Sequence, residues 1–157
     1  MSEKLSHINA EGNAQMVDVT NREISERSAS ASGQVLLSKS VLSLIAEGKM
    51  PKGDVLATAR IAGIMGAKKT AELIPLCHPI SISSVNVDLE IVDDGVNIYS
   101  NVKISDRTGV EMEALTAVSI AALTIIDMTK ALDPGATIKN IQVDEKDGGR
   151  NGHWKRT

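Results

Sequence analysis

Acidic and basic side chains share one polar stripe of a long segment, residues 110–132, whose apolar spacing predicts a helix. At about 100° per residue, the stripe spans roughly 80° opposite a broad apolar face. Its members are Glu113, Thr116, Thr124, Asp127 and Lys130. Asp127 and Lys130 are i,i+3 neighbours and can form an ion pair. The stripe is therefore either a solvated face with a surface ion pair or part of a site for proton transfer.

Glu113 and Asp127 lie near opposite ends of this predicted helix, about 21 Å apart along its axis. Two groups at that separation cannot serve one small site within a single chain. They could serve one site where two chains meet, if each chain contributed a different end of the helix.

A cysteine and a histidine, Cys77 and His78, lie between Pro75 and Pro79 in the sequence LIPLCHP. The prolines fix an extended, rigid loop in which neighbouring side chains point to opposite faces. A nucleophile–base dyad is therefore not expected. A zinc site has poor support, because the other histidines are at 7 and 153 and there is no second cysteine. Two interpretations remain: a buried thiol beside a hydrogen-bonded histidine, or His78 as an anion ligand or acid–base group.

Two further segments combine lysine with glycine. Lys52 comes shortly before Asp54, a good N-cap for the next helix, and helix N-termini favour anions. The tail, residues 146–157, carries Lys146 and Arg150 among glycines, without the GxxxxGK[ST] spacing of a Walker A loop. A solvated tail is the alternative interpretation. Together these segments predict a polyanionic small substrate held by lysines, with carboxylates nearby for proton transfer.

The elements that must position these residues form one domain, residues 1–157, beginning with a polar arm (residues 1–27) expected to dock on a neighbouring chain. Periodicity and turn signals predict strand, helix, helix, strand, strand, helix and strand, at residues 29–37, 38–47, 55–72, 80–92, 96–105, 110–132 and 136–143. Glycines and alanines in the second helix, among them Gly63 and Gly66, indicate tight helix packing. The order is typical of an α+β fold: an antiparallel sheet with helices packed on one face, close to a ferredoxin-like βαββαβ arrangement.

Composition excludes several classes of protein. Hydrophobic residues make up 42% and charged residues 24% of the chain, as in globular domains. The longest nearly uncharged run, residues 114–126, is shorter than the roughly 20 residues that span a bilayer, so no membrane contact is expected. A net charge of −3 argues against nucleic-acid binding. With one cysteine and no secretory signal pattern, the cytoplasm is the expected location.

Several motifs together resemble one family. KGDV at 52–55, LIPLCHP at 73–79, TGVEMEALT at 108–116 and Asp127–Met128 are similar to molybdenum cofactor biosynthesis protein C, the cyclic pyranopterin monophosphate synthases. The resemblance, from about residue 5 to 153, implies a lyase. Its substrate would be 3′,8-cyclo-7,8-dihydroguanosine 5′-triphosphate from a radical SAM enzyme, and its products cyclic pyranopterin monophosphate and pyrophosphate. It also implies a homohexamer, a trimer of dimers with active sites at subunit interfaces.

The resemblance assigns roles to individual residues. It implies a catalytic carboxylate, two substrate-binding segments and three functional lysines: Asp127; Leu76–Cys77–His78 and Met112–Glu113; and Lys52, Lys130 and Lys146. We expect Lys52 and Lys130 to donate or accept protons, with Asp127 orienting Lys130. Lys146 and His78 are expected to contact the phosphates. No metal or cofactor is expected.

The tail departs from the family pattern, since Asp147 replaces the usual serine or threonine and Arg150 a frequent lysine. A carboxylate beside a triphosphate is unfavourable unless it points away. Two other functions stay open at this point. A nucleotide-binding or regulatory module on the same fold would need the phosphate-binding residues but not Asp127 and Lys130. An enzyme with Cys77 as nucleophile would need an exposed thiolate.

Overall fold

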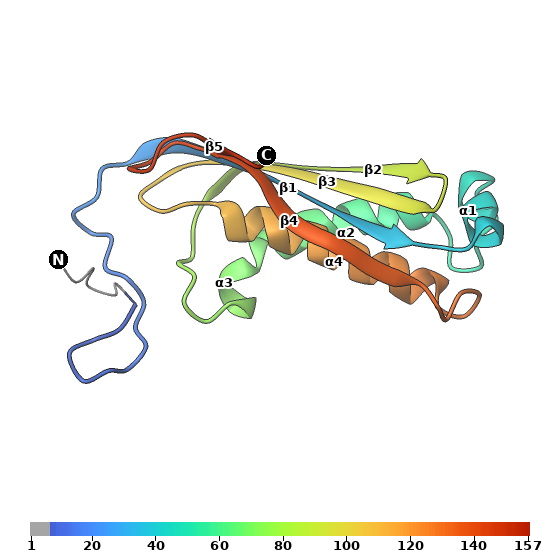
Figure 1. Ribbon diagram of the computed structural model, residues 1–157, viewed down its shortest axis with the longest axis horizontal. Coiled ribbons are helices and arrows are strands. Elements are labelled where there is room, and N and C mark those ends of the chain that lie inside the picture. The colour runs from blue at the N-terminus through green and yellow to red at the C-terminus, as the bar shows by residue number, and fades with distance from the viewer. Residues whose placement is uncertain (1–6) are drawn as a thin grey trace.

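The structure is a computed structural model that describes residues 7–157, so the first six residues of the predicted arm lie outside it. Helices pack on one face of a five-stranded antiparallel sheet (Figure 1). The elements are β1 (Ser25–Leu36), α1 (Lys39–Ala46), α2 (Val55–Lys68), α3 (Thr70–Leu73), β2 (Ile82–Val92), β3 (Gly95–Asp106), α4 (Glu111–Thr129), β4 (Thr137–Asp147) and β5 (Trp154–Lys155). The fold is α+β, as predicted.

The strands lie in the order β2-β3-β1-β4-β5, and every neighbouring pair is antiparallel. The central strand β1 pairs with β3 over its whole length, from Ser25 opposite Asp106 to Leu36 opposite Gly95. The first four strands therefore have the order expected for a ferredoxin-like βαββαβ arrangement, which confirms that prediction. The short strand β5 is added at one edge of the sheet.

Small residues allow β1 to lie close to the helices. Its side chains that face the helices and are buried are Ala29, Ala31 and Val35. A Cβ on Gly33 would lie 2.8 Å from Val118 Cγ1 of α4, so this position accepts only glycine without a shift. The alternate residues of β1 are serines and glutamine, which point to the uncovered face of the sheet. The sheet therefore has one apolar face and one polar face.

The helix α4 is the centre of the core and packs against α2 and against β1, β3 and β4. Its fully buried apolar residues are Ala114, Ala117, Val118, Ala121, Ala122 and Ile125. By length and composition alone α4 is apolar enough to cross a membrane. More than half of it is buried inside this domain, as is typical of a core helix.

Glycines let α2 approach α4 closely. A Cβ on Gly63 would lie 2.8 Å from the backbone oxygen of Ala117, and a Cβ on Gly66 would lie 2.7 Å from Ile120 Cγ1. Neither position has room for a side chain between the two helices. The prediction of tight helix packing is confirmed.

One predicted helix boundary is wrong. The second helix was expected over residues 55–72, but the backbone of Lys69 leaves helical geometry (φ −110°, ψ 11°) and separates α2 from α3. Beside this break, the buried Thr70 donates its hydroxyl to the Ala67 carbonyl at 2.9 Å. The Lys69 amide also donates to this carbonyl, so the end of α2 is closed by both a backbone and a side-chain donor.

The prediction for the last strand is also wrong at its C-terminal boundary. It was expected over residues 136–143, but β4 continues to Asp147, and the tail returns along it as β5. Because β1 begins at Ser25, it extends far enough for Ser28 to pair with Asp147. Lys146 therefore lies on a strand and not in a solvated tail.

Gly63→Val is expected to lower the free energy of unfolding by about 2 kcal/mol or more, because its side chain would overlap the carbonyl oxygen of Ala117 and force α2 away from α4. The matched control is Gly135→Val, at an exposed loop position where the nearest atom to a new Cβ is 3.6 Å away. This control should change stability by less than about 0.5 kcal/mol. Urea unfolding measures both, and equal midpoints for the two variants would contradict the close-packing account.

Candidate active site

One group of charged side chains gathers at the C-terminal end of α4. Asp127 lies in the last turn of this helix, Lys130 is its C-cap, and Lys52 precedes α2. Lys130 Nζ donates to Asp127 Oδ1 at 2.7 Å. Lys52 Nζ donates to Asp127 Oδ2 at 3.0 Å and to the Asp127 carbonyl at 2.8 Å. The structure thus brings the three residues predicted for catalysis into one Asp127 cluster (Lys52, Asp127 and Lys130).

The start of α2 positions Lys52. Asp54 is the N-cap of α2, as predicted, and its carboxylate accepts a hydrogen bond from the Ala57 amide at 2.9 Å. Gly53 has φ +93°, in the left-handed region that glycine adopts without strain, and it turns the chain between the cap and Lys52. The lysine therefore reaches the C-terminal end of α4, where helix carbonyls without intrahelical partners attract cations.

The Asp127 cluster is open to solvent, with between 46% and 60% of each side chain exposed. Hydrogen bonds from Lys130 and then from Lys52, together with their charges, hold the pKa of Asp127 below its usual value. The carboxylate is therefore negative at neutral pH. Two ammonium groups and one carboxylate leave one positive charge, so the cluster can accept a further anionic or polar group.

The residues predicted for substrate binding on the loop and on α4 line a cavity of about 240 Å³ at the other end of this helix. We call it the Glu113 cavity. Its main lining residues are Leu76, Cys77, His78, Met112 and Glu113 from the body of the domain, and Val17, Val19 and Arg22 from the arm. All five residues predicted from the two motifs therefore meet in one place. The arm residues were not predicted to take part.

Glu113 is almost fully buried, with 4% of its surface exposed. Burial, and to a smaller degree the charge of Glu111, raise the pKa of Glu113 to about 7. A carboxyl group with such a pKa can both give and take a proton near neutral pH. The solvated-face interpretation of the α4 stripe is wrong for Glu113 and for Thr116, which are both buried. For Glu113 the cause is the cover of this helix end by the arm and the loop around Cys77.

Cys77 borders the same cavity but is not an activated nucleophile. Burial raises the pKa of its thiol, and the charge of Glu113 raises it further. The thiol therefore stays protonated at neutral pH. The adjacent His78 uses Nε2 for the Val17 carbonyl, at 2.7 Å. These contacts argue against an enzyme with Cys77 as nucleophile.

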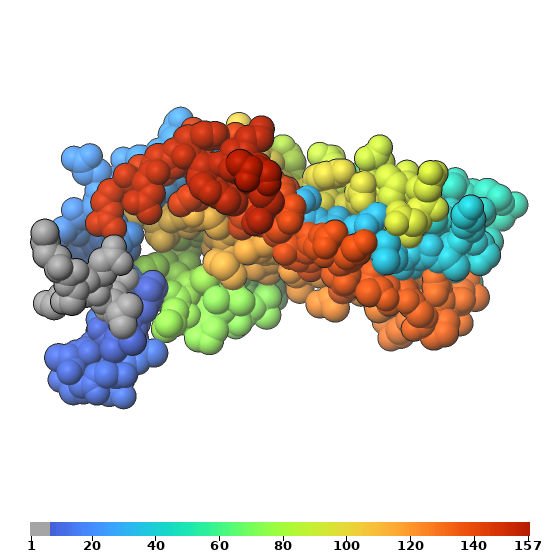
Figure 2. Space-filling model, viewed as in Figure 1, coloured from blue at the N-terminus to red at the C-terminus, as the bar shows by residue number. Residues whose placement is uncertain are grey.

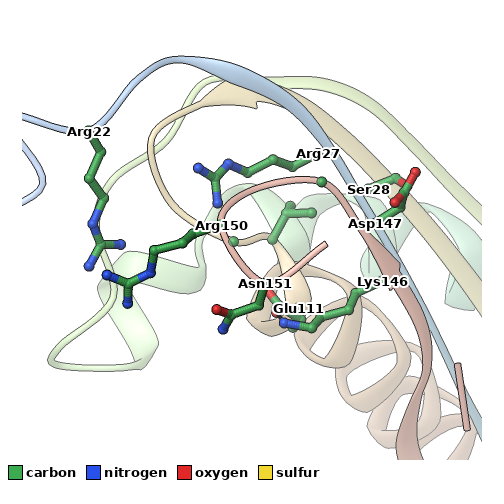
Figure 3. A pocket seen from close by; sticks show the side chains of 11 residues that line it. Arg22, Arg27, Ser28, Glu111, Lys146, Asp147, Arg150 and Asn151 are labelled. Carbon is green, nitrogen blue, oxygen red and sulfur yellow. Dashed lines mark ion pairs between the residues drawn. The ribbon is translucent and has the colours of Figure 1, made fainter. Parts of the chain in front are cut away.

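A more polar pocket of about 180 Å³ adjoins the Glu113 cavity and shares part of its lining. We call it the arginine pocket. Its charged residues include Arg22, Arg27, Glu111, Lys146 and Arg150 (Figure 3). Lys146 Nζ lies 3.3 Å from Glu111 Oε1 and forms an ion pair with it. Among these side chains, none of the three arginines has a carboxylate partner. Guanidinium groups suit phosphate oxygens in geometry and charge, so the pocket fits a phosphorylated ligand.

Asp147 also borders the arginine pocket, but its carboxylate points away from Lys146 and Arg150 (Figure 3). Neighbouring residues of a strand alternate between the two faces of a sheet, which explains why Asp147 and Lys146 diverge. On its own side, Asp147 Oδ1 lies 3.9 Å from His153 Nδ1. Asp147 therefore fits beside bound phosphates, because its carboxylate points away from the cations that would hold them.

Sequence reasoning missed Arg22 and Arg27, which lie in a polar segment without a motif. Arg27 is held on β1 by a hydrogen bond from its Nε to the Asp106 carbonyl at 3.0 Å. Gly149, which lies against the Arg27 guanidinium, has φ +75°, in the left-handed region that favours glycine. The pairing of β1 with β4 brings Arg27 to Lys146, and the Arg107 side chain, whose Nε donates to the Arg22 carbonyl, helps to hold Arg22 in place; no residue spacing indicates either.

The structure does not bring all predicted site residues together within one chain. The Asp127 cluster lies at the C-terminal end of α4, while the Glu113 cavity and Lys146 lie at its N-terminal end. The rise of the helix separates Glu113 from Asp127 by about 21 Å. Within a single chain the predicted site residues therefore form two separate groups.

The raised pKa of Glu113 predicts a pH dependence of stability. The folded chain holds the Glu113 proton more tightly than the unfolded chain, whose usual pKa is 4.5. The associated stability is fully present below about pH 4.5 and is lost as the pH rises through about 7. Glu113→Gln resembles the neutral acid and cannot ionise. Between pH 5 and pH 8 its free energy of unfolding should therefore fall less than that of wild type, and the difference between the two losses should reach up to about 3 kcal/mol.

Urea unfolding at the two pH values measures this difference. Glu90→Gln, at an exposed position of β2, is the control and should follow wild type. If the free energy of unfolding changes with pH equally in wild type and Glu113→Gln, the raised pKa of Glu113 is contradicted.

Comparison with known proteins adds to this geometry. The sequence matches the family model of the MoaC family over residues 16–149. It is 58% identical over 155 residues to a protein of Streptomyces avermitilis named cyclic pyranopterin monophosphate synthase, covering 99% of this chain and 91% of that relative. A protein of the same name from Nocardioides is 54% identical over 156 residues, 98% of this chain and 96% of the relative. The match spans both ends of α4, and the chain belongs to the MoaC family.

Proposed function

We propose that this protein is a cyclic pyranopterin monophosphate synthase of molybdenum cofactor biosynthesis. It converts 3′,8-cyclo-7,8-dihydroguanosine 5′-triphosphate to cyclic pyranopterin monophosphate and pyrophosphate, as a lyase. The observation that carries the proposal is the arginine pocket next to the Glu113 cavity, in a chain that shares more than half its residues with proteins of that name. Such a pair of sites fits a ligand with a phosphate chain and a ring system.

The arginine pocket would hold the triphosphate. Lys146 with Arg27 and Arg150 supplies donors for the phosphate oxygens, and the same groups stabilise the charge that develops on departing pyrophosphate. Lys146 contacts Glu111, so a phosphate must compete with that carboxylate. His78 adds a further donor at the edge of the cavity when its ring is protonated.

The Asp127 cluster would carry out proton transfer. The reaction opens and rebuilds a purine-derived ring and closes a cyclic phosphate, so it needs several proton donors and acceptors. Lys52 and Lys130 take these roles, and Asp127 orients both through the hydrogen bonds it accepts. A lysine has an ordinary pKa near 10.4 and must be shifted by burial or by other cations to act as a base near pH 7. Docking of the substrate and a second chain over the exposed cluster would supply such burial.

Two chains would complete each active site. The Asp127 cluster of one chain would meet the Glu113 cavity and arginine pocket of another, because one helix cannot bring its two ends together. Exposed apolar side chains on the helices offer a surface for such contacts; they include Ile61, Met65, Leu73 and Leu123. The assembly we propose is a homohexamer built as a trimer of dimers. It acts in the cytoplasm on substrate supplied by a radical SAM enzyme.

Asp127→Asn and Lys130→Ala should each reduce pyrophosphate release from the cyclic triphosphate by about 10²- to 10⁴-fold, because Lys130→Ala removes a positioned proton-transfer group and Asp127→Asn removes the carboxylate that positions it. Substrate binding and the fold should persist, since both side chains are exposed and carry little packing. Asp93→Asn, an exposed carboxylate in the β2–β3 turn, is the matched control and should keep full activity.

The assay uses purified protein, the cyclic triphosphate and detection of released pyrophosphate. Absence of release from wild-type protein would overturn the proposed function. Wild-type rates in both variants would instead remove Asp127 and Lys130 from the catalytic machinery and leave them as part of a solvated surface.

Lys146→Ala should weaken pyrophosphate binding by about 1.5–3 kcal/mol, because it removes a charge-assisted hydrogen bond from the arginine pocket. Lys139→Ala, an exposed lysine on the same strand β4, removes an equal charge outside the pocket and is the control. Isothermal titration calorimetry of the two variants distinguishes a local contact from a general charge effect. Equal affinities for both would remove Lys146 from the site.

A further inference from the structure

The arm forms one side of the Glu113 cavity although it has little regular structure of its own. Its described part, residues 7–24, projects from the body of the domain (Figure 2) and contains one isolated β-bridge, between Ile8 and Ala14. Three residues within 17–22 line the cavity. The position of this arm segment 17–22 must therefore depend on its contacts with the body.

Two hydrogen bonds join the arm segment 17–22 to the body within residues 7–157. His78 Nε2 lies 2.7 Å from the Val17 carbonyl oxygen, and Arg107 Nε donates to the Arg22 carbonyl at 2.9 Å. Between these points the segment makes its own turn, in which the Arg22 amide donates to the Val19 carbonyl at 3.0 Å. The arm segment is thus a turn fixed near both ends.

The chemistry of the first bond assigns its donor. A carbonyl oxygen can only accept, so the hydrogen lies on His78 Nε2. The loop that carries His78 is rigid, since Pro75 and Pro79 bracket it and the Cys77 amide donates to the Ile74 carbonyl at 3.1 Å. A donor on a rigid loop can fix a flexible partner in place.

We propose that His78 is a positioning residue whose Nε2–H holds the arm segment 17–22 in place as one side of the Glu113 cavity. Through this bond it keeps Arg22 at the arginine pocket, which adjoins the cavity. While the bond is made, only Nδ1 of His78 remains for a ligand. The effect on substrate rests on the proposed function, but the bond itself does not.

Hydrogen–deuterium exchange of the substrate-free protein tests the bond directly. His78→Ala should speed exchange of the amides in residues 17–22 by about 2- to 10-fold, the equivalent of losing one ordinary hydrogen bond. His78→Gln places an N–H at a similar distance from the backbone and should restore protection. Cys77→Ala alters the adjacent cavity residue without touching the bond, and it should leave exchange in the arm unchanged.

Unchanged exchange in His78→Ala would overturn the proposal, as would failure of His78→Gln to restore protection. A measurement on the wild-type protein avoids any loss of folding in the variants. Selective ¹⁵N-histidine NMR should find that the neutral ring of His78 carries its hydrogen on Nε2. A neutral ring with its hydrogen on Nδ1 would also overturn the proposal.

Kinetics then separates positioning from general damage. His78→Ala should raise KM more than it lowers kcat, because a released arm withdraws Arg22 but leaves the Asp127 cluster intact, and His78→Gln should recover most of the loss. An equal loss in both variants would show that holding the arm is not what the reaction needs. If wild-type protein releases no pyrophosphate at all, the proposed function fails while the exchange result still decides the role of His78.

Discussion

Close packing of α4 against β1 and α2 is the constraint on which the rest of the structure depends. Glycines of its neighbours lie against α4, and at Gly33 and Gly63 there is no room for even one added methyl group without a shift. A chain with no phenylalanine can still form a dense core in this way, because backbones that approach closely bury apolar surface without large side chains. The helix is consequently fixed along its whole length, and so are the residues at its two ends.

A rigid central helix explains why the charged residues lie in two separate groups, one at each end of α4. At its C-terminal end, unpaired helix carbonyls and Asp127 together attract Lys52 and Lys130, in a setting that water can enter. At its N-terminal end, burial raises the pKa of Glu113 to about 7, while the arginines line the adjoining pocket. One end thus offers exposed cations and the other a buried acid beside an anion pocket. The two environments are complementary, and they can act on one small ligand only if two chains combine them.

Periodicity predicted most of the fold, because alternation along the strands and the cap at Asp54 are local properties of the sequence. The family resemblance of the motifs around Cys77 and Glu113, and not their spacing, implied that the loop and α4 both bind substrate. Pairing between distant segments could not be predicted in the same way. Arg27 reaches Lys146 only because β1 extends beyond its apolar part, and Glu113 lies in a cavity that the arm and the loop around Cys77 enclose. In both cases, contacts between distant segments overrode the local pattern.

Co-assembly of two inactive variants tests the shared site most directly. Chains carrying Asp127→Asn and chains carrying Glu113→Gln would be co-expressed with different tags, and assemblies holding both would be purified. If each site takes one end of α4 from each of two chains, some sites receive neither substitution, and pyrophosphate release should recover to about a quarter of the wild-type rate when equal numbers of the two chains mix at random. Mixed assemblies no more active than either parent would contradict the account, because each chain would then hold a complete site of its own.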